Sequence, residues 1–196
     1  MTALPLTRKK FTPQEYLMVE RASGSRSEFL DGEIYAMSGA SRAHVIINAN
    51  VGGVVHSQLK GTPCQGMFHD MKVRIGKGRA YVYPDFLIVY GKGRYVDAEQ
   101  DVLLDPTVIF EILSPSTERY DRMTKFDLYK EIESLQDYIL IAQDQPRVEH
   151  WCRHPDGGWN QNVISDKRCS LNIESTSVVV ALADLYDRVE FEPESR

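Results

Sequence analysis

Two short apolar runs, each associated with one carboxylate, most constrain how this chain can fold. The run Phe86 to Tyr90 follows directly after Tyr83-Pro84-Asp85, and the run Val108 to Leu113 contains Glu111. Both are rich in β-branched and aromatic residues and are bounded by Pro or Gly, which predicts strands in the interior of a sheet. A charged Glu inside such a strand is costly unless it has a partner. We therefore expect Asp85 and Glu111 to lie on adjacent strands, where they can share a divalent metal ion.

The segment after the second run predicts a helix that directs a lysine toward this pair. Stepping back from Ile132 by four, three and four residues gives Leu128, Lys125 and Asp121, which share one face of a helix. Because that face is apolar at Ile132 and Leu128, we expect Lys125 to point toward the sheet edge near Glu111. The alternative is an exposed pair between Lys125 and Asp121 on a solvated first turn, worth about 0.3–0.5 kcal/mol.

The remaining pattern predicts a mixed succession of helices and strands. Thr12-Pro13-Gln14-Glu15 is typical of a helix start, and Asp31-Gly32 between two apolar segments predicts a hairpin. Apolar spacing from Ser41 to Lys60 predicts a long helix, whose Gly52-Gly53 pair indicates close packing. Further expectations are a strand over 68–75, a surface loop over 91–106, a helix capped by Ser116 or Thr117 with Leu135 on its buried face, strands over 137–142, 147–153 and 159–164, and a short strand and helix from Val178.

Length and composition favour one α/β domain of 196 residues, with flexible ends at about 1–10 and 188–196. Apolar runs are too short to span a membrane, and the first ten residues lack the apolar core of a signal peptide. The three cysteines are widely spaced, which does not indicate a disulfide framework. We therefore expect a cytoplasmic protein with no membrane partner. The net charge of −5 gives no overall attraction to nucleic acid, which counts against a protein that coats DNA nonspecifically.

A local basic surface is compatible with this negative charge. Between Met71 and Tyr95 the chain has six basic residues and one acidic residue. Lys72 and Arg74 within this segment are candidates for binding DNA phosphates, although solubilising side chains at Gly-rich turns are the simpler interpretation. His44, near the start of the long predicted helix, can line the active site or can be an ordinary helix-end histidine.

A second metal hypothesis concerns His150, Cys152 and His154, which alternate along one predicted strand. Side chains two residues apart point to the same face of a strand, so all three can face one Zn²⁺ ion. A structural role is the competing interpretation, because Val148 shares that face and no fourth ligand is evident nearby. Cys64 and Cys169 have no base at motif spacing.

The ordered motifs resemble those of a known family. Ser-Glu-Phe-Leu-Asp-Gly-Glu-Ile (27–34), Tyr-Pro-Asp-Phe-Leu-Ile-Val (83–89), Phe-Glu-Ile-Leu-Ser-Pro-Ser-Thr (110–117) and Asp-Arg-Met-Thr-Lys-Phe-Asp-Leu-Tyr (121–129) are similar to motifs of the Uma-two family. Its bacterial members are assigned as endonucleases of the PD-(D/E)XK, restriction-endonuclease-like superfamily. The resemblance implies a mixed central sheet flanked by helices, metal-dependent cleavage of DNA, and a homodimer.

The resemblance also assigns roles to individual residues. Asp85 and Glu111 match the motif acids, and Glu28 matches an additional N-terminal acid, although an ordinary exposed strand residue is the alternative for Glu28. The superfamily's usual lysine, two residues after the Glu, is replaced by Leu113, and Lys125 resembles a relocated lysine. Carboxylate ligands suit Mg²⁺ or Mn²⁺. The sequence thus predicts a metal-dependent endodeoxyribonuclease; the alternative is a noncatalytic module that keeps the nuclease fold and binds nucleic acid or protein.

Overall fold

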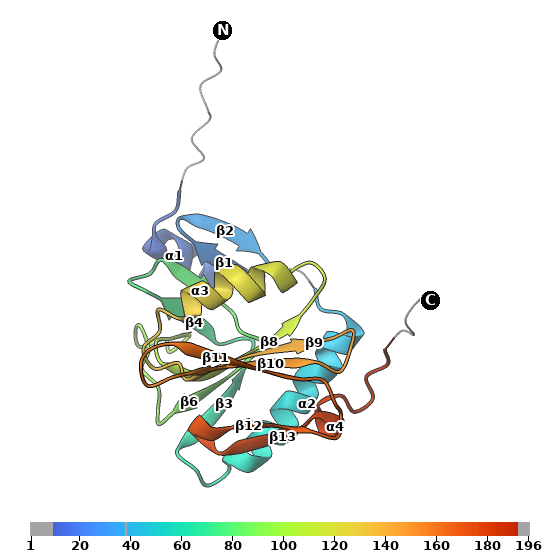
Figure 1. The fold of residues 1–196 in the computed structure, drawn as a ribbon. Coiled ribbons are helices and arrows are strands. Elements are labelled where there is room, and N and C mark those ends of the chain that lie inside the picture. Colours follow the sequence, from blue (N-terminus) through green and yellow to red (C-terminus); the bar gives the residue numbers. More distant parts are fainter. Residues whose placement is uncertain (1–9, 38, 192–196) are drawn as a thin grey trace.

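The computed structural model describes residues 10–37 and 39–191, which form two packed sheets, a separate two-stranded hairpin and several helices (Figure 1). The small sheet has the strand order β2-β1-β5-β4-β7, and the central sheet has the order β11-β10-β9-β8-β6-β3. The small-sheet strands are β1 (Ser27–Leu30), β2 (Glu33–Ala36), β4 (Lys72–Ile75), β5 (Ala80–Val82) and β7 (Val102–Leu103). The central-sheet strands are β3 (Cys64–Phe68), β6 (Phe86–Tyr90), β8 (Pro106–Leu113), β9 (Asp137–Ala142), β10 (Val148–Arg153) and β11 (Trp159–Ile164).

The helices and the hairpin complete the fold. The hairpin consists of β12 (Ser170–Ile173) and β13 (Val178–Ala181). The helical elements are α1 (Pro13–Ala22), α2 (Arg42–Leu59), the π-helix η1 (Tyr120–Lys125), α3 (Phe126–Tyr129), the 3-10 helix η2 (Glu174–Thr176) and α4 (Leu182–Leu185). Among the residues described, no helix is long and apolar enough to cross a membrane.

The central sheet is mixed, as the sequence predicts. Strands β8 and β9 run parallel, whereas β6 pairs antiparallel with β8, and Phe86 lies opposite Phe110 in that pairing. Asp85 and Glu111 therefore come from adjacent strands. The α/β class with a mixed central sheet flanked by helices is confirmed.

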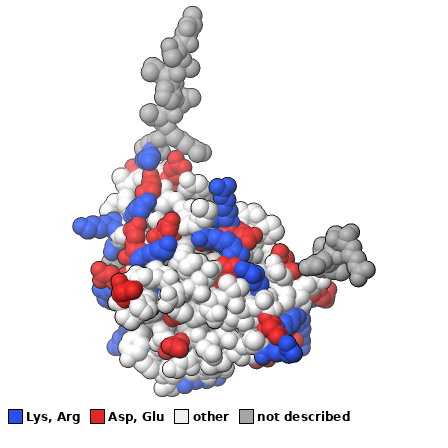
Figure 2. Space-filling view, in the orientation of Figure 1, with Lys and Arg blue, Asp and Glu red and all other residues white. Residues whose placement is uncertain are grey.

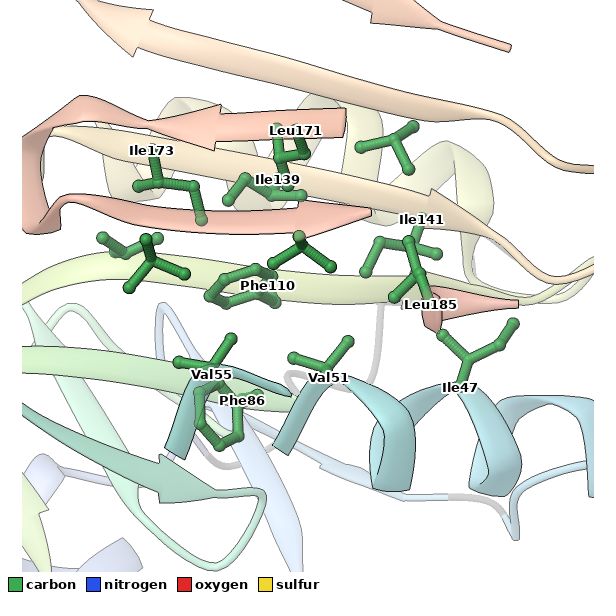
Figure 3. Close-up of a cluster of buried hydrophobic side chains, with 14 of the residues drawn as sticks. Ile47, Val51, Val55, Phe86, Phe110, Ile139, Ile141, Leu171, Ile173 and Leu185 are labelled. Carbon is green, nitrogen blue, oxygen red and sulfur yellow. The ribbon is translucent and has the colours of Figure 1, made fainter. Parts of the chain in front are cut away.

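Alternating residues of the central sheet supply two cores. On one face, Phe86, Phe110 and Ile139 pack with α2, α4 and the β12–β13 hairpin (Figure 3). On the other face, residues such as Ile109 and Leu140 pack with the small sheet and α3. A smaller cluster joins α1 to the small sheet. Glu111 lies in β8 between Phe110 and Ile112, so strand alternation directs it to the face covered by the small sheet and α3.

Several local elements form for the reasons that the sequence indicates. Thr12 and Glu15 make the reciprocal hydrogen bonds of a capping box at the start of α1. Asp31 and Gly32 have φ values of 48° and 93°, as a two-residue hairpin turn requires. A Cβ on Gly52 would lie 2.2 Å from the Phe68 ring, which explains the glycine at that position of α2.

Other boundaries differ from the predictions. The strand expected over 68–75 is two strands of different sheets, because the chain turns at residues 69–71. The loop expected over 91–106 contains β7, whose Val102 and Leu103 are buried, and Pro106 already belongs to β8. Strand β12 was not anticipated.

The helix expected after Pro115 is also shorter and differently built. Its first turn uses Ser114, whose Oγ accepts a hydrogen bond from the Thr117 amide, in place of a cap by Ser116 or Thr117. The helix ends at Tyr129, and Ile132 and Leu135 are buried beyond it in the following turns.

The predicted flexible ends fall mainly on residues 1–9 and 192–196, outside the described part of the chain. Within 188–191, Val189 is 8% exposed, and the Phe191 ring lies 5.5 Å from that of Tyr186. The packed part of the chain therefore reaches Phe191.

Candidate active site

A cavity of about 1030 Å³ opens where the small sheet, the start of α2 and the π-helix meet the edge of the central sheet. Five residues singled out from the sequence line it together: Glu28, His44, Asp85, Glu111 and Lys125. They come from β1, the first turn of α2, the residue before β6, the middle of β8 and the end of η1. Residues widely separated in the sequence thus meet at one site.

Asp85 is held on both carboxylate oxygens. Its Oδ2 accepts a hydrogen bond from the Ile112 amide at 2.7 Å, and its Oδ1 lies 2.9 Å from Nε2 of His44. The Ile112 amide is a fixed donor on the neighbouring strand. His44 lies in the first turn of α2, where its backbone amide donates a hydrogen bond to the capping Ser41 hydroxyl. These contacts orient the Asp85 carboxylate at the cavity wall.

Lys125 lies among three buried carboxylates. Its Nζ is 3.1 Å from Glu28 Oε1, 3.1 Å from Glu111 Oε1 and 3.5 Å from Asp121 Oδ1. Glu28 is 8% exposed, so it is not the ordinary exposed strand residue of the alternative interpretation. The Lys125–Asp121 pair does form, but both residues are buried, in contrast to a solvated first turn.

The π-helical geometry of η1 accompanies this arrangement. Asp121 and Lys125, four residues apart in η1, are both buried on the side that faces the sheets. Short π-helical segments are rare and occur frequently at functional sites. The apolar spacing of the sequence indicates the correct face but not the π-helical winding.

Tyrosine side chains complete the surroundings of Glu111. The Tyr129 hydroxyl donates to Glu111 Oε1 at 2.7 Å, and the Tyr83 amide donates to Glu28 Oε1 at 3.1 Å. Tyr120 also lines the cavity, with its ring centroid 5.7 Å from Lys125 Nζ. The sequence motifs do not indicate Tyr120, and the one local signal for Tyr129 is its position four residues after Lys125.

Burial and the crowding of like charges change the protonation of these groups. Burial raises the pKa of Glu111 well above its usual value, and nearby Asp121, Asp85 and Glu28 add to the rise, which Lys125 opposes. Burial likewise raises the pKa of Asp121. For Lys125, burial alone would lower the pKa, but Glu111 and Glu28 outweigh it and keep the ammonium charged. The site therefore has more acidic groups than its one lysine can neutralise.

The donor type of these acids suits a hard divalent cation, although no three of them have donor atoms within 4.8 Å of one another. Glu28, Asp85, Glu111 and Asp121 offer carboxylate oxygens, the ligand type that Mg²⁺ and Mn²⁺ prefer. Asp121 was not singled out as a ligand from the sequence, although it shares the stripe that identified Lys125. A cation at the cavity would supply the positive charge that the buried acids lack.

The structure does not bring Lys72 and Arg74 into the cavity wall. Lys72 is 2% exposed, and its Nζ lies over the rings of Tyr16 and Tyr83 and 3.7 Å from Asp101. Arg74 is half-buried on the same strand. The face shown in Figure 2 carries Lys and Arg interspersed with Asp and Glu, without a continuous basic surface. Neither residue therefore presents a free cation beside Asp85.

The mixed sheet carries Asp85 and Glu111 on adjacent strands, and Lys125 contacts Glu111; the fold is that of a nuclease-like α/β protein. A solved structure from Anabaena variabilis ATCC 29413, described as a "putative nuclease belonging to DUF820", superposes with a TM-score of 0.74 at 18% identity, covering 90% of this chain and 98% of that one. A family model, Uma2, described as "Putative restriction endonuclease", matches residues 13–182. The chain therefore belongs to the Uma2 family.

Two curated relatives come from Synechocystis sp. (strain ATCC 27184 / PCC 6803 / Kazusa). The protein slr1290 is 31% identical over 174 residues, which cover 89% of each chain. The protein sll1609 is 33% identical over 153 residues, covering 78% of this chain and 86% of the relative. The similarity thus extends over most of the chain and most of each relative.

Proposed function

We propose that this protein is a divalent-metal-dependent endonuclease that hydrolyses phosphodiester bonds of DNA in this cavity. The observation that carries the proposal is the position of the Lys125 ammonium, 3.1 Å from both Glu111 and Glu28 in a cavity that Asp85 also lines. Membership of a family of restriction-endonuclease type supports the reaction class. The oxygen donors support Mg²⁺ or Mn²⁺ as the cofactor.

Asp85 and Glu111, with Glu28 as a third ligand, would hold the metal ion. When bound, the ion supplies Lewis-acid activation of a water molecule and stabilises charge on the phosphate oxygens. His44 and the Ile112 amide keep the Asp85 carboxylate in a fixed orientation. A hydrogen bond from the Tyr129 hydroxyl orients the Glu111 carboxylate in the same way.

Lys125 takes the role that a lysine two residues after the motif Glu has in the wider superfamily. Leu113 occupies that position and is 4% exposed within the core shared with the small sheet. An ammonium that is already oriented by Glu28 and Glu111 can donate to a phosphate oxygen or to the attacking water without reorganisation. In the reaction the water oxygen bonds to phosphorus while the bond to the leaving alcohol oxygen breaks.

A nicking assay on supercoiled DNA tests the proposal. We expect cleavage that requires Mg²⁺ or Mn²⁺ in the wild type and falls by about 100-fold or more in Glu111→Gln and Lys125→Met, since each removes a group that acts on the developing charge. Lys60→Met, at an exposed lysine after α2, is the matched control and should cleave normally. Normal cleavage by folded Lys125→Met would contradict the relocated-lysine role.

DNA binding without metal-dependent cleavage would instead indicate a noncatalytic module with a nuclease fold.

The same preparations test the proposed homodimer by sedimentation equilibrium, where a dimer has twice the chain mass of 22.4 kDa. A monomer at all concentrations used in the nicking assay would remove the dimer from the proposal.

A further inference from the structure

Three potential metal ligands meet on the side of the central sheet opposite Glu111. Asp137 at the start of β9 pairs directly with Cys152 of β10, and His150 lies two residues earlier on β10. Both strands direct these side chains to the face that also carries Ile139, which packs with the β12–β13 hairpin (Figure 3). Glu111 in β8 points to the other face, so this cluster is distinct from the candidate active site.

One oxygen, one nitrogen and one sulfur donor converge within this cluster. His150 Nε2 lies 2.7 Å from Asp137 Oδ1 and 3.1 Å from Cys152 Sγ, and the donor atoms of the three residues lie within 4.8 Å of one another. Among residues 10–37 and 39–191, this is the one group of three or more His, Cys, Asp or Glu side chains with donors so close together. His154, considered with this strand in the sequence, instead lies 2.8 Å from Asp156.

Hydrogen bonds within the cluster compete for one ring nitrogen. If Nε2 of His150 donates to the Asp137 carboxylate, it cannot also accept a hydrogen bond from the Cys152 thiol, whose other partners are Asp137 and, at 3.6 Å, Nδ1 of His150. A cation bound by all three atoms would satisfy them together. Zn²⁺ bonds of about 2.0–2.3 Å place tetrahedral donors roughly 3.3–3.8 Å apart, so His150 Nε2 needs to move away from Asp137 Oδ1 and Cys152 Sγ by less than about 1 Å.

The surroundings have features of a supported metal site. Asp137 and His150 are 3% and 4% exposed, whereas Cys152 is half-buried and gives access from solvent. The Ser175 hydroxyl of η2 donates to Asp137 Oδ2, the oxygen that does not face His150. Ligating carboxylates commonly have such a second hydrogen bond, which fixes their orientation.

We propose that Asp137, His150 and Cys152 bind Zn²⁺, with the fourth position open to water. The sulfur and imidazole donors favour Zn²⁺ over Mg²⁺, the reverse of the preference in the cavity. Binding would release the thiol proton and the proton shared by His150 and Asp137. Through Asp137 and Ser175, the ion would connect β9 and β10 to the turn between β12 and β13.

Cobalt substitution tests this site without relying on nuclease activity. Co²⁺ added to the reduced, metal-free wild type should produce a sulfur-to-cobalt charge-transfer band in the near ultraviolet. No cysteine lines the active-site cavity, so a cobalt ion bound there cannot produce this band. Cys152→Ser should lose the band, whereas the control Cys169→Ser, at an exposed cysteine, should keep it. Zn²⁺ should displace Co²⁺ from the wild type and raise its thermal midpoint more than that of Cys152→Ser.

Two results would overturn the proposal. One is a folded, fully reduced wild type that gives no charge-transfer band at saturating Co²⁺. The other is a band that persists in Cys152→Ser, which would assign the sulfur ligand elsewhere. Asp137→Asn provides a second variant of nearly the same shape; it should weaken Zn²⁺ in competition with a chromophoric chelator, and unchanged affinity would exclude Asp137 as a ligand.

Discussion

The ammonium of Lys125 lies within 3.5 Å of three carboxylates that are themselves almost excluded from solvent. Removing one member of a buried ionic group leaves uncompensated charge and costs about 3–5 kcal/mol. Lys125 therefore has two separable effects, one on the stability of the metal-free protein and one on the proposed reaction. A divalent ion can take over the stabilising role of Lys125, because it also neutralises the carboxylates, but it cannot take over the role of Lys125 in the reaction.

We expect Lys125→Met to unfold at lower urea concentration than the wild type in the presence of a chelator, by about 3–5 kcal/mol. Mn²⁺ should restore much of this stability, because the ion neutralises the same acids, while cleavage stays low. The double variant Lys125→Met/Glu111→Gln should be more stable than Lys125→Met alone without metal. Equal stability of wild type and Lys125→Met in chelator would show that the carboxylates do not depend on this lysine.

Lys72 provides a second prediction at this scale. Burial lowers the pKa of its ammonium, and Asp101 and Glu20 partly oppose that change. Below the folded-state pKa both the folded and the unfolded protein are protonated at Lys72, so the cost of burying the charge is fully present there. Between the folded pKa and the unfolded value of about 10.4, only the unfolded state keeps the proton, and wild-type stability gains as pH rises.

The stability of Lys72→Met relative to wild type should therefore be greatest at neutral pH and decrease as pH rises toward 10. Urea unfolding of both proteins across this range measures the difference, and other titrating groups cancel because the two proteins share them. If the stability of Lys72→Met relative to the wild type instead increases with pH, the tyrosine rings and Asp101 stabilise the ammonium more than burial destabilises it.

At the scale of elements, α2 contains a matched pair of glycines with different environments. A Cβ at Gly52 would lie 2.2 Å from Cζ of Phe68, whereas a Cβ at Gly53 meets no atom within 4 Å. Gly53→Ala should stabilise the protein by up to about 1 kcal/mol, because Ala has the higher helix propensity. Gly52→Ala should destabilise it, because Phe68 must move. Thermal unfolding of the two variants distinguishes the cases, and two equal shifts would contradict this packing.

Elements with a strong local signal were predictable from the sequence, and those set by distant contacts were not. The Thr12 capping box and the Asp31-Gly32 turn involve neighbouring residues, so their outcomes follow from local chemistry. The short strand β7 exists because it pairs in parallel with β4, a contact thirty residues away along the chain that no periodicity reveals. The helix after Pro115 ends early for the same reason, since Ile132 reaches the core from a turn.

The candidate site shows the same division. Glu111 in an apolar strand and Lys125 on an apolar helix face are charged residues at positions where the local pattern predicts apolar ones, so the sequence indicates them as candidates. The structure brings both, with Asp85, Glu28 and His44, to one cavity. Lys72 was a candidate for a different reason, the basic composition of the segment around it. Composition alone does not indicate whether a side chain is buried. Composition indicates charge along the chain, whereas the position of a charge depends on the packing of α1 and the small sheet around it.

At the scale of the whole molecule, electrostatics limits how DNA can approach. The chain has a net charge of −5, and on the face in Figure 2 Lys and Arg lie close to Asp and Glu, with no continuous basic area. Arg79, in the basic segment, is paired with Asp31 and Glu131. If the proposed function holds, we expect phosphate contacts near the cavity, where a metal ion would offset the acids and where Arg26 is the arginine in the lining.

We expect Arg26 to make a phosphate contact at the cavity mouth. Its side chain is 39% exposed, and its pairing with the largely exposed Asp70 can exchange for a phosphate at little cost. With Ca²⁺ in place of the catalytic ion, Arg26→Gln should reduce the slope of log affinity against log salt by about 0.9, the value for one contact to duplex DNA. Arg79→Gln is the control and should leave the slope unchanged, because Arg79 lies outside the cavity wall. If Arg79→Gln lowers the slope and Arg26→Gln does not, DNA binds over the hairpin turns of the small sheet and the cavity is not its point of contact.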